Sequence, residues 1–133
     1  MTLRTIEWKN NEVIMIDQTK LPNELVYVKF TDYNDVAEAI RTLVVRGAPA
    51  IGVSGAFGMA LAVLQSKAET KEELLSDLEK AQKILFMTRP TAVNLVWGLE
   101  QIMKVAKEND SVDEIKESII DKAKQMADDD IKI

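Results

Sequence analysis

One uncharged stretch constrains the fold of this chain more than any other feature. No Asp, Glu, Lys or Arg occurs between Arg46 and Lys67, and four of the five glycines of the chain lie in this interval. Pro49 suits the first turn of a helix, because its missing N–H would have no intrahelical partner there. The residues after it are apolar on every side of a helical wheel, which is typical of a buried helix. The pattern predicts a central helix over residues 48–64, around which the rest of the domain packs.

Three glycines inside this predicted helix indicate that something approaches its backbone closely. Gly52, Gly55 and Gly58 each lower helix stability by roughly 0.5–1 kcal/mol relative to Ala. The approaching group is either a neighbouring helix or a ligand, and the sequence leaves both open. Their spacing, G-x-x-G-x-x-G, matches neither of the common nucleotide-binding loops. A membrane span is not expected, since a bilayer needs about 20 predominantly apolar residues and this run is broken by glycines.

Composition excludes several classes of function. The 133 residues fit one domain, and a net charge of −5 without a basic cluster argues against nucleic acid as a partner. The chain contains neither Cys nor His, so it has no thiol nucleophile, no common general base and no common metal ligand. We therefore expect no metal site in this chain. The N-terminus lacks a signal segment, which favours the cytoplasm.

The apolar period changes from about two to about 3.6 near Phe30, which separates a sheet from a helical bundle. Asn10 and Asn11 favour a tight hairpin, because Asn tolerates positive φ. The runs with strand character are residues 3–8, 13–16 and 25–30, with a turn at 21–24. The predicted fold is α+β: a small antiparallel three-stranded sheet within residues 1–30, followed by a bundle of about five helices within residues 31–133.

Helix-start signals divide the second part of the chain. Thr31 or Asp32 can cap a helix that ends near Arg46 and Gly47, and the central helix follows. Capping boxes at residues 70–73 and 111–114 predict two more helix starts, and the break at 88–91 predicts another. The apolar positions expected to face inward from the last three helices are Leu74, Leu78, Ala81, Ile84, Leu85, Leu95, Leu99, Ile102, Val105, Ile115, Ile119, Ala123 and Met126.

Two arginines stand before proline-led helix starts. Arg46 precedes Pro49, and Arg89 precedes Pro90. A guanidinium beside the free N–H groups of a helix start is a good clamp for a phosphate or carboxylate. If the two starts lie side by side, they form one anion site, but spacing alone does not show this. A tightly packed helix without a ligand, and a solvated or locally bonded amide for the nearby Asn94, are the alternatives.

Several motifs resemble the N-terminal part of the methylthioribose-1-phosphate isomerase family. They are RGAPAIG at residues 46–52, TRPTAVNL at 88–95, RTIEW at 4–8 and IDQTKLP at 16–22. The resemblance runs from Arg4 to about Ile131. It implies that Arg46, Gly47, Ala48 and Arg89 contact the phosphate of a sugar phosphate, with no cofactor. The implied reaction, in methionine salvage, converts 5-methylthioribose 1-phosphate to 5-methylthioribulose 1-phosphate.

The resemblance also implies a second domain. In the family, a Rossmann-like C-terminal domain carries the catalytic Cys and Asp, so residues 1–133 correspond to the N-terminal domain alone. Three acids at 128–130 and two isoleucines at 131 and 133 end the chain, and this pattern is explained either by a frayed tail or by a cut within a longer protein. We expect no catalytic residue in this chain, no isomerase activity from it alone, and a homo-oligomer, with a dimer as the expected form.

The wider superfamily supplies two alternatives. One is a regulatory, protein-binding subunit like those of translation initiation factor 2B. The other is a relative of ribose-1,5-bisphosphate isomerase. The pair of arginine-bearing motifs favours a sugar-phosphate enzyme, because a module that only binds proteins does not need them.

Overall fold

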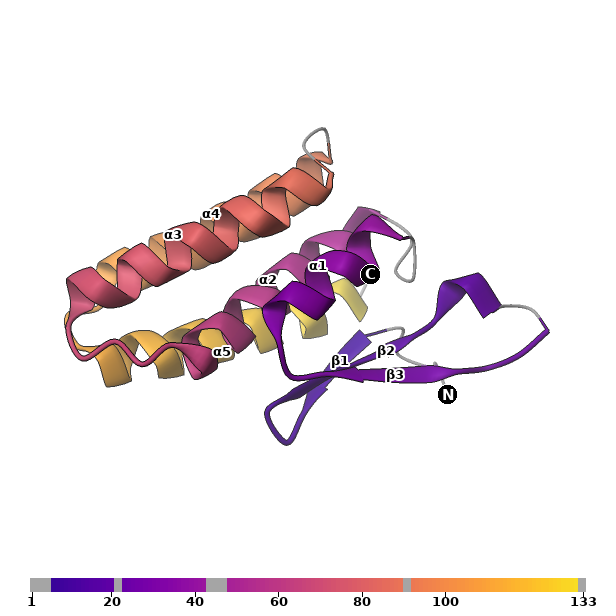
Figure 1. Ribbon diagram of the computed structural model, residues 1–133, viewed down its shortest axis with the longest axis horizontal. Coiled ribbons are helices and arrows are strands. Elements are labelled where there is room, and N and C mark those ends of the chain that lie inside the picture. The colour runs from indigo at the N-terminus through magenta and orange to yellow at the C-terminus, as the bar shows by residue number, and fades with distance from the viewer. Residues whose placement is uncertain (1–5, 21–22, 43–47, 90–91, 132–133) are drawn as a thin grey trace.

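The computed structural model describes residues 6–20, 23–42, 48–89 and 92–131. In these residues a three-stranded antiparallel sheet is followed by five α-helices (Figure 1), which confirms the predicted α+β class. Outside the described residues lie residues 3–5 of the first predicted strand, residues 21–22 of the turn predicted at 21–24, and residues 43–47, which include Arg46 and Gly47 of the first arginine motif. So do residues 90–91 and 132–133.

The sheet has the order β1-β2-β3, with strands Ile6–Lys9, Glu12–Ile16 and Tyr27–Phe30. Asn10 and Asn11 join the first two strands at φ 53° and 62°, which confirms the predicted hairpin. A short 3-10 helix, Gln18–Lys20, follows β2. Alternate residues of β1 and β2 turn one face of the sheet toward the helices, and the buried ones are Ile6, Val13 and Met15.

The five helices are α1 (Tyr33–Arg41), α2 (Ala48–Gln65), α3 (Lys71–Thr88), α4 (Val93–Glu108) and α5 (Val112–Ile131). Three of them begin at a side-chain cap. The Asp32 carboxylate accepts the Asn34 N–H, and the Thr70 and Ser111 hydroxyls accept the N–H three residues later. Each cap satisfies one of the donors that a helix start leaves unpaired, so these boundaries follow from the sequence.

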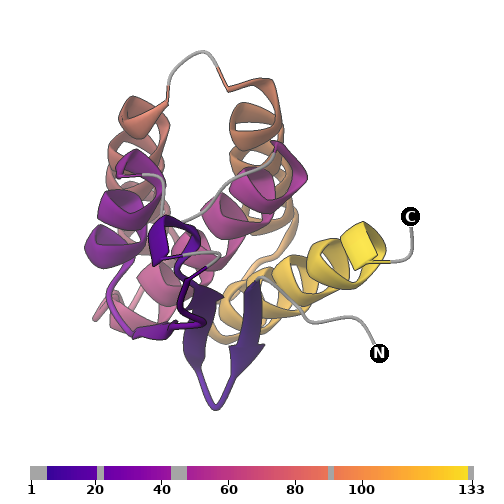
Figure 2. The ribbon, with the colours of Figure 1, turned by 90° about the vertical axis from the view of Figure 1, so that its right-hand side faces the viewer.

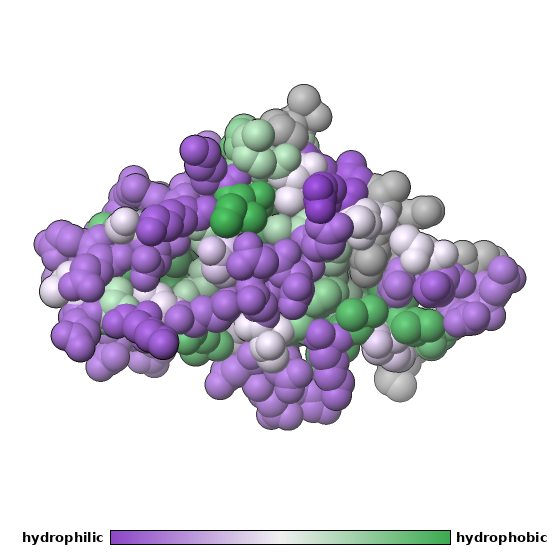
Figure 3. Space-filling view, viewed as in Figure 1, coloured by the Kyte–Doolittle hydropathy of each residue, from purple (hydrophilic) through white to green (hydrophobic). Residues whose placement is uncertain are grey.

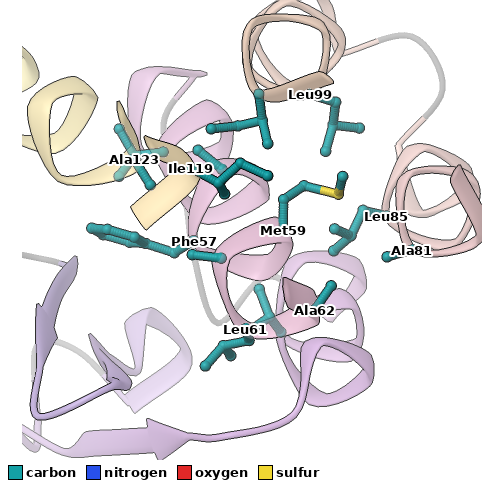
Figure 4. Packing of buried hydrophobic residues seen from close by; sticks show 14 of the residues in the cluster. Phe57, Met59, Leu61, Ala62, Ala81, Leu85, Leu99, Ile119 and Ala123 are labelled. Carbon is teal, nitrogen blue, oxygen red and sulfur yellow. The ribbon is translucent and has the colours of Figure 1, made fainter. Parts of the chain in front are cut away.

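Helix α2 is the centre of the molecule. Every residue from 50 to 63 is buried, and α2 contacts the other four helices as well as β1 and β2. The buried side chains around it come from all sides (Figure 4). Phe57 stacks on Trp8 of β1, with ring centroids 5.7 Å apart. Because Val53, Phe57 and Leu61 are at most 4% exposed, the prediction that the central helix is buried on every side is confirmed for its interior, and Leu64 near its end is 39% exposed.

The group that approaches the α2 glycines is a neighbouring helix. A Cβ on Gly98 of α4 would lie 2.7 Å from the carbonyl oxygen of Gly52, and a Cβ on Gly52 would lie 2.8 Å from the carbonyl oxygen of Asn94. Real Cβ atoms essentially never come so close to a backbone oxygen. The backbones of α2 and α4 therefore touch at this point, and only glycine fits there on both helices.

The inward faces of the last three helices are as predicted except at one position. Ile84 is 39% exposed, whereas its neighbour Leu85 is fully buried. Val105 is partly buried and packs against the core, as predicted. Successive residues of a helix are turned by about 100°. Leu85 continues the stripe that α3 packs inward, so Ile84 is turned away from it. Ile84 and Met87 instead line a groove of about 300 Å³ between α1 and α3. The face of the molecule that shows α1 and α3 is otherwise mainly hydrophilic (Figure 3).

The backbone contact between α2 and α4 predicts that alanine destabilises the protein more at Gly98 than at Gly58. Gly98→Ala should lower the free energy of unfolding by about 1–3 kcal/mol, because the added methyl forces two backbones apart. Gly58→Ala is the matched control: its nearest neighbours would all be side-chain methyl groups, those of Leu85 at 3.0 and 3.1 Å and one of Val36 at 3.5 Å, and the Leu85 methyl groups can shift. Urea unfolding of both variants measures the difference. A Gly98→Ala variant no less stable than Gly58→Ala would contradict the contact.

Candidate functional site

One end of the helical bundle collects four helix termini. In Figure 2, which looks onto this end, α1 and α3 finish on one side while α2 and α4 begin on the other. Helix starts present unpaired N–H groups and a partial positive charge, and helix ends present unpaired carbonyls. This end therefore pairs a donor-rich half with an acceptor-rich half.

The starts of α2 and α4 lie side by side and level. The methyl positions of Gly52 and Gly55 meet residues 94 and 95 in turn, so the two helices run in the same direction. Gly52 is four residues into α2 and packs between Asn94 and Gly98, which are one and five residues after Val93, the first residue of α4. At about 1.5 Å per residue the two starts differ in level by only about 1.5 Å. Their partial positive charges are thus adjacent.

The starts of α2 and α4 lack the acidic residues that offset the positive end of the helix dipole in the other three helices. The first turns of α1, α3 and α5 each contain at least one acidic residue, but those of α2 and α4 contain none. Ala92, at the N-cap of α4, makes no side-chain cap hydrogen bond. Two level, parallel helix starts without acids repel each other unless an anion lies between their donors. The charge distribution therefore favours an external anion at this end.

Arg89 lies at this end as the C-cap residue of α3. Its Nε–H donates a hydrogen bond to the carbonyl oxygen of Ile40, near the end of α1, at 3.2 Å. The side chain is half-buried. In the part of the chain that the structure describes, this bond uses one of the five guanidinium donors, and the two terminal NH₂ groups retain theirs. Arg89 can therefore offer a fork of donors to an anion.

The predicted site residues fall partly outside the described chain. Arg46 and Gly47 lie among residues 43–47, so the expected convergence of Arg46 with Arg89 stays a prediction. Ala48 is the first residue of α2, one of the two adjacent helix starts. The start of α4, predicted near Thr91, is at Val93, which makes Arg89 the end of α3 rather than the residue before α4. Asn94 is half-buried, and its backbone packs against Gly52.

Two features of this end were missed by reasoning from the sequence. The first is the lack of acids in the opening turns of α2 and α4, which is visible in the sequence once all five helix starts are compared. The second is the carbonyl of Ile40 as the partner of Arg89, for which a sequence carries no signal. No group of three metal-ligating residues occurs among the described residues, and none of the helices described is long and apolar enough to cross a membrane.

A small antiparallel sheet that leads into a bundle of five helices defines the class of domain. Comparison with known families places this domain in one of them. Residues 44–133 match the initiation factor 2 subunit family. The chain belongs to this family.

Relatives of two kinds are similar to this chain. The methylthioribose-1-phosphate isomerase of Geobacter metallireducens is 47% identical over 135 aligned residues. The crystal structure of 5-methylthioribose 1-phosphate isomerase from Pyrococcus horikoshii is 51% identical with a TM-score of 0.91 and covers 96% of this chain. The crystal structure of the translation initiation factor eIF-2B, subunit delta, from A. fulgidus is 41% identical with a TM-score of 0.92 and covers 98%.

The match covers a minor part of each relative. All of this chain aligns with 39% of the Geobacter metallireducens protein. The corresponding shares of the two crystal structures are 36% and 38%. The chain thus spans about two fifths of the length of the relatives it matches.

The arrangement predicts that phosphate stabilises this chain through Arg89. At ten times its dissociation constant, inorganic phosphate should add about 1.4 kcal/mol to the free energy of unfolding and raise the Tm by several degrees. The measurement is a thermal melt in phosphate against one in chloride at equal ionic strength. Arg89→Ala controls for the general stabilising effect of phosphate on folded proteins. If the variant gains as much as the wild type, no specific site is present at this end.

Proposed function

We propose that this chain is the N-terminal, phosphate-binding part of an aldose–ketose isomerase that converts 5-methylthioribose 1-phosphate to 5-methylthioribulose 1-phosphate. The observation that carries the proposal is the pair of level helix starts without acidic residues, with the donor fork of Arg89 at the same end. Two of the relatives described above bear the name of this isomerase.

Each proposed site residue has a distinct role toward the phosphate. The backbone N–H groups at Gly47 and Ala48 bind its oxygens at the start of α2. Arg46 and Arg89 add charge-assisted hydrogen bonds, which are shorter and stronger than neutral ones. Together they hold the sugar phosphate in one orientation, which lowers the entropic part of the barrier for the later steps.

The chemistry itself is assigned to residues outside this chain. The isomerisation opens the sugar ring and moves hydrogen from C2 to C1, so C1 is reduced while C2 is oxidised and no external oxidant is required. The proton transfers need a positioned acid and base, and this chain has neither His nor Cys to provide them. We assign them to a Rossmann-like C-terminal domain within the part of the relatives that this chain does not match. The whole protein is proposed to act as a homodimer.

A second function, a protein-binding subunit related to initiation factor 2B, is favoured by one observation. The structure from A. fulgidus, which is named as such a subunit, matches this chain as well in fold as the isomerase does. A shared fold does not establish a shared activity. The helix starts without acidic residues and Arg89 support the sugar-phosphate function, because protein binding at another surface would leave them without a role.

The proposal predicts a loss of activity on removal of either arginine. In a protein that joins this chain to the remaining part found in its relatives, Arg46→Ala and Arg89→Ala should each remove interactions worth roughly 1.5–3 kcal/mol. The expected fall in kcat/KM for 5-methylthioribose 1-phosphate is about ten- to a hundredfold.

Arg41→Ala is the matched control for this experiment. Arg41 is exposed on α1, pairs with Glu38 and carries the same charge as Arg89 near the same end of the bundle. The Arg41→Ala variant should keep kcat/KM within about twofold of wild type, because an exposed ion pair contributes little. The 133-residue chain alone should show no turnover. Folded Arg46→Ala and Arg89→Ala variants with unchanged kinetics would refute the phosphate site.

A further inference from the structure

We propose that helix α1 positions Arg89 for its ligand: the Ile40 carbonyl holds the Nε–H, so that Arg89 meets the phosphate end-on, through its two terminal NH₂ groups. This inference rests on the proposed function of the same end of the bundle. It assigns a positioning role to a helix that carries none of the proposed site residues.

The hydrogen bond joins parts of the chain that are 49 residues apart. The last carbonyls of a helix have no partner within it, and its C-terminal end attracts cations. At the end of α1, the Glu38 carbonyl accepts both the N–H and the hydroxyl of Thr42, each at 2.9 Å. The Ile40 carbonyl accepts the N–H of Thr42 and, with its second lone pair, the Arg89 Nε–H. The guanidinium is thus held by a carbonyl oxygen at the C-terminal end of α1.

The bond restricts how Arg89 can present its remaining donors. A guanidinium is planar and offers two kinds of paired donor, one along the side that includes Nε and one across the end formed by the two NH₂ groups. The Ile40 carbonyl uses the Nε–H on the side edge. The end-on pair matches two oxygens of a phosphate. Lysine cannot replace this arrangement, since one ammonium group cannot bind Ile40 and also present two parallel donors in a fixed plane.

Helix α1 is itself fixed relative to α2, whose start forms part of the proposed site. The side-chain oxygen of Gln65, the last residue of α2, accepts the N–H of Tyr33, the first residue of α1, at 2.8 Å. Val36 and Ile40 are fully buried in the same core as α2. The position of the Ile40 carbonyl is therefore set by the packing of α1 on α2. Through Nε, that packing also sets the position of the Arg89 guanidinium.

NMR of the ¹⁵N,¹³C-labelled chain tests this role directly. The Arg89 Nε–Hε signal should exchange slowly with water and show a coupling across the hydrogen bond to the Ile40 carbonyl carbon. The exposed Arg41 supplies the internal reference and should exchange fast. On addition of inorganic phosphate, the Arg89 NH₂ signals should shift and sharpen, while the Nε protection and the coupling to Ile40 persist.

Binding measurements on variants complete the test. Arg89→Lys should weaken the binding of inorganic phosphate by about tenfold, close to the effect of Arg89→Ala. Arg41→Lys should leave the phosphate affinity unchanged. Two results would overturn the inference and leave the proposed function standing. In the first, phosphate binds while the Arg89 Nε–H exchanges rapidly or loses its bond to Ile40. In the second, Arg89→Lys binds phosphate as tightly as the wild type. A protected Nε without any response to phosphate at this end overturns the proposed function and the end-on binding with it.

Discussion

The contact between the backbones of α2 and α4 is the constraint on which the rest of the structure depends. Gly52 and Gly98 let the two helices touch without any side chain between them. Gly98 cannot be replaced by a larger residue without moving a carbonyl oxygen, because its Cβ position is 2.7 Å from Gly52 O. This contact fixes the relative height of the two helices, and their starts come out level as a result. The glycines lower helix propensity, and the close packing of α2 in the core offsets that cost.

The distribution of helix caps follows from the same arrangement. Helices α1, α3 and α5 begin with side-chain caps and acidic first turns, and such helices need no ligand to complete their starts. The starts of α2 and α4 have no acids in their first turns, and they are the two that the glycine contact brings together. The acids are thus missing where an anion is proposed to bind. An acidic residue there would compete with a phosphate for the same N–H groups.

Most of the fold could be predicted from the sequence because its signals are local. The Asn10–Asn11 turn, the caps at Asp32 and Thr70, and the uncharged run of α2 each fix one element through its own residues. The error at Ile84 arose because Ile84 and its neighbour Leu85 are both apolar and only one of them continues the inward stripe of α3; Leu85 is buried, and Ile84 lines the groove between α1 and α3. Arg89 is a proposed site residue that the sequence motif points to, but its bond to Ile40 joins residues 49 apart and depends on how α1 packs. Such tertiary contacts leave no trace in a local pattern.

The affinity of inorganic phosphate for Gly98→Ala tests the central claim most directly, namely that the glycine contact builds the anion site. The substitution keeps both Arg46 and Arg89 in the sequence and changes only the distance between α2 and α4. Measured well below its melting temperature, folded Gly98→Ala should bind phosphate about tenfold more weakly than wild type, because small displacements of positioned donors are costly. Gly58→Ala, on the same central helix, should bind within about twofold of wild type. A folded Gly98→Ala variant with wild-type affinity would contradict the account.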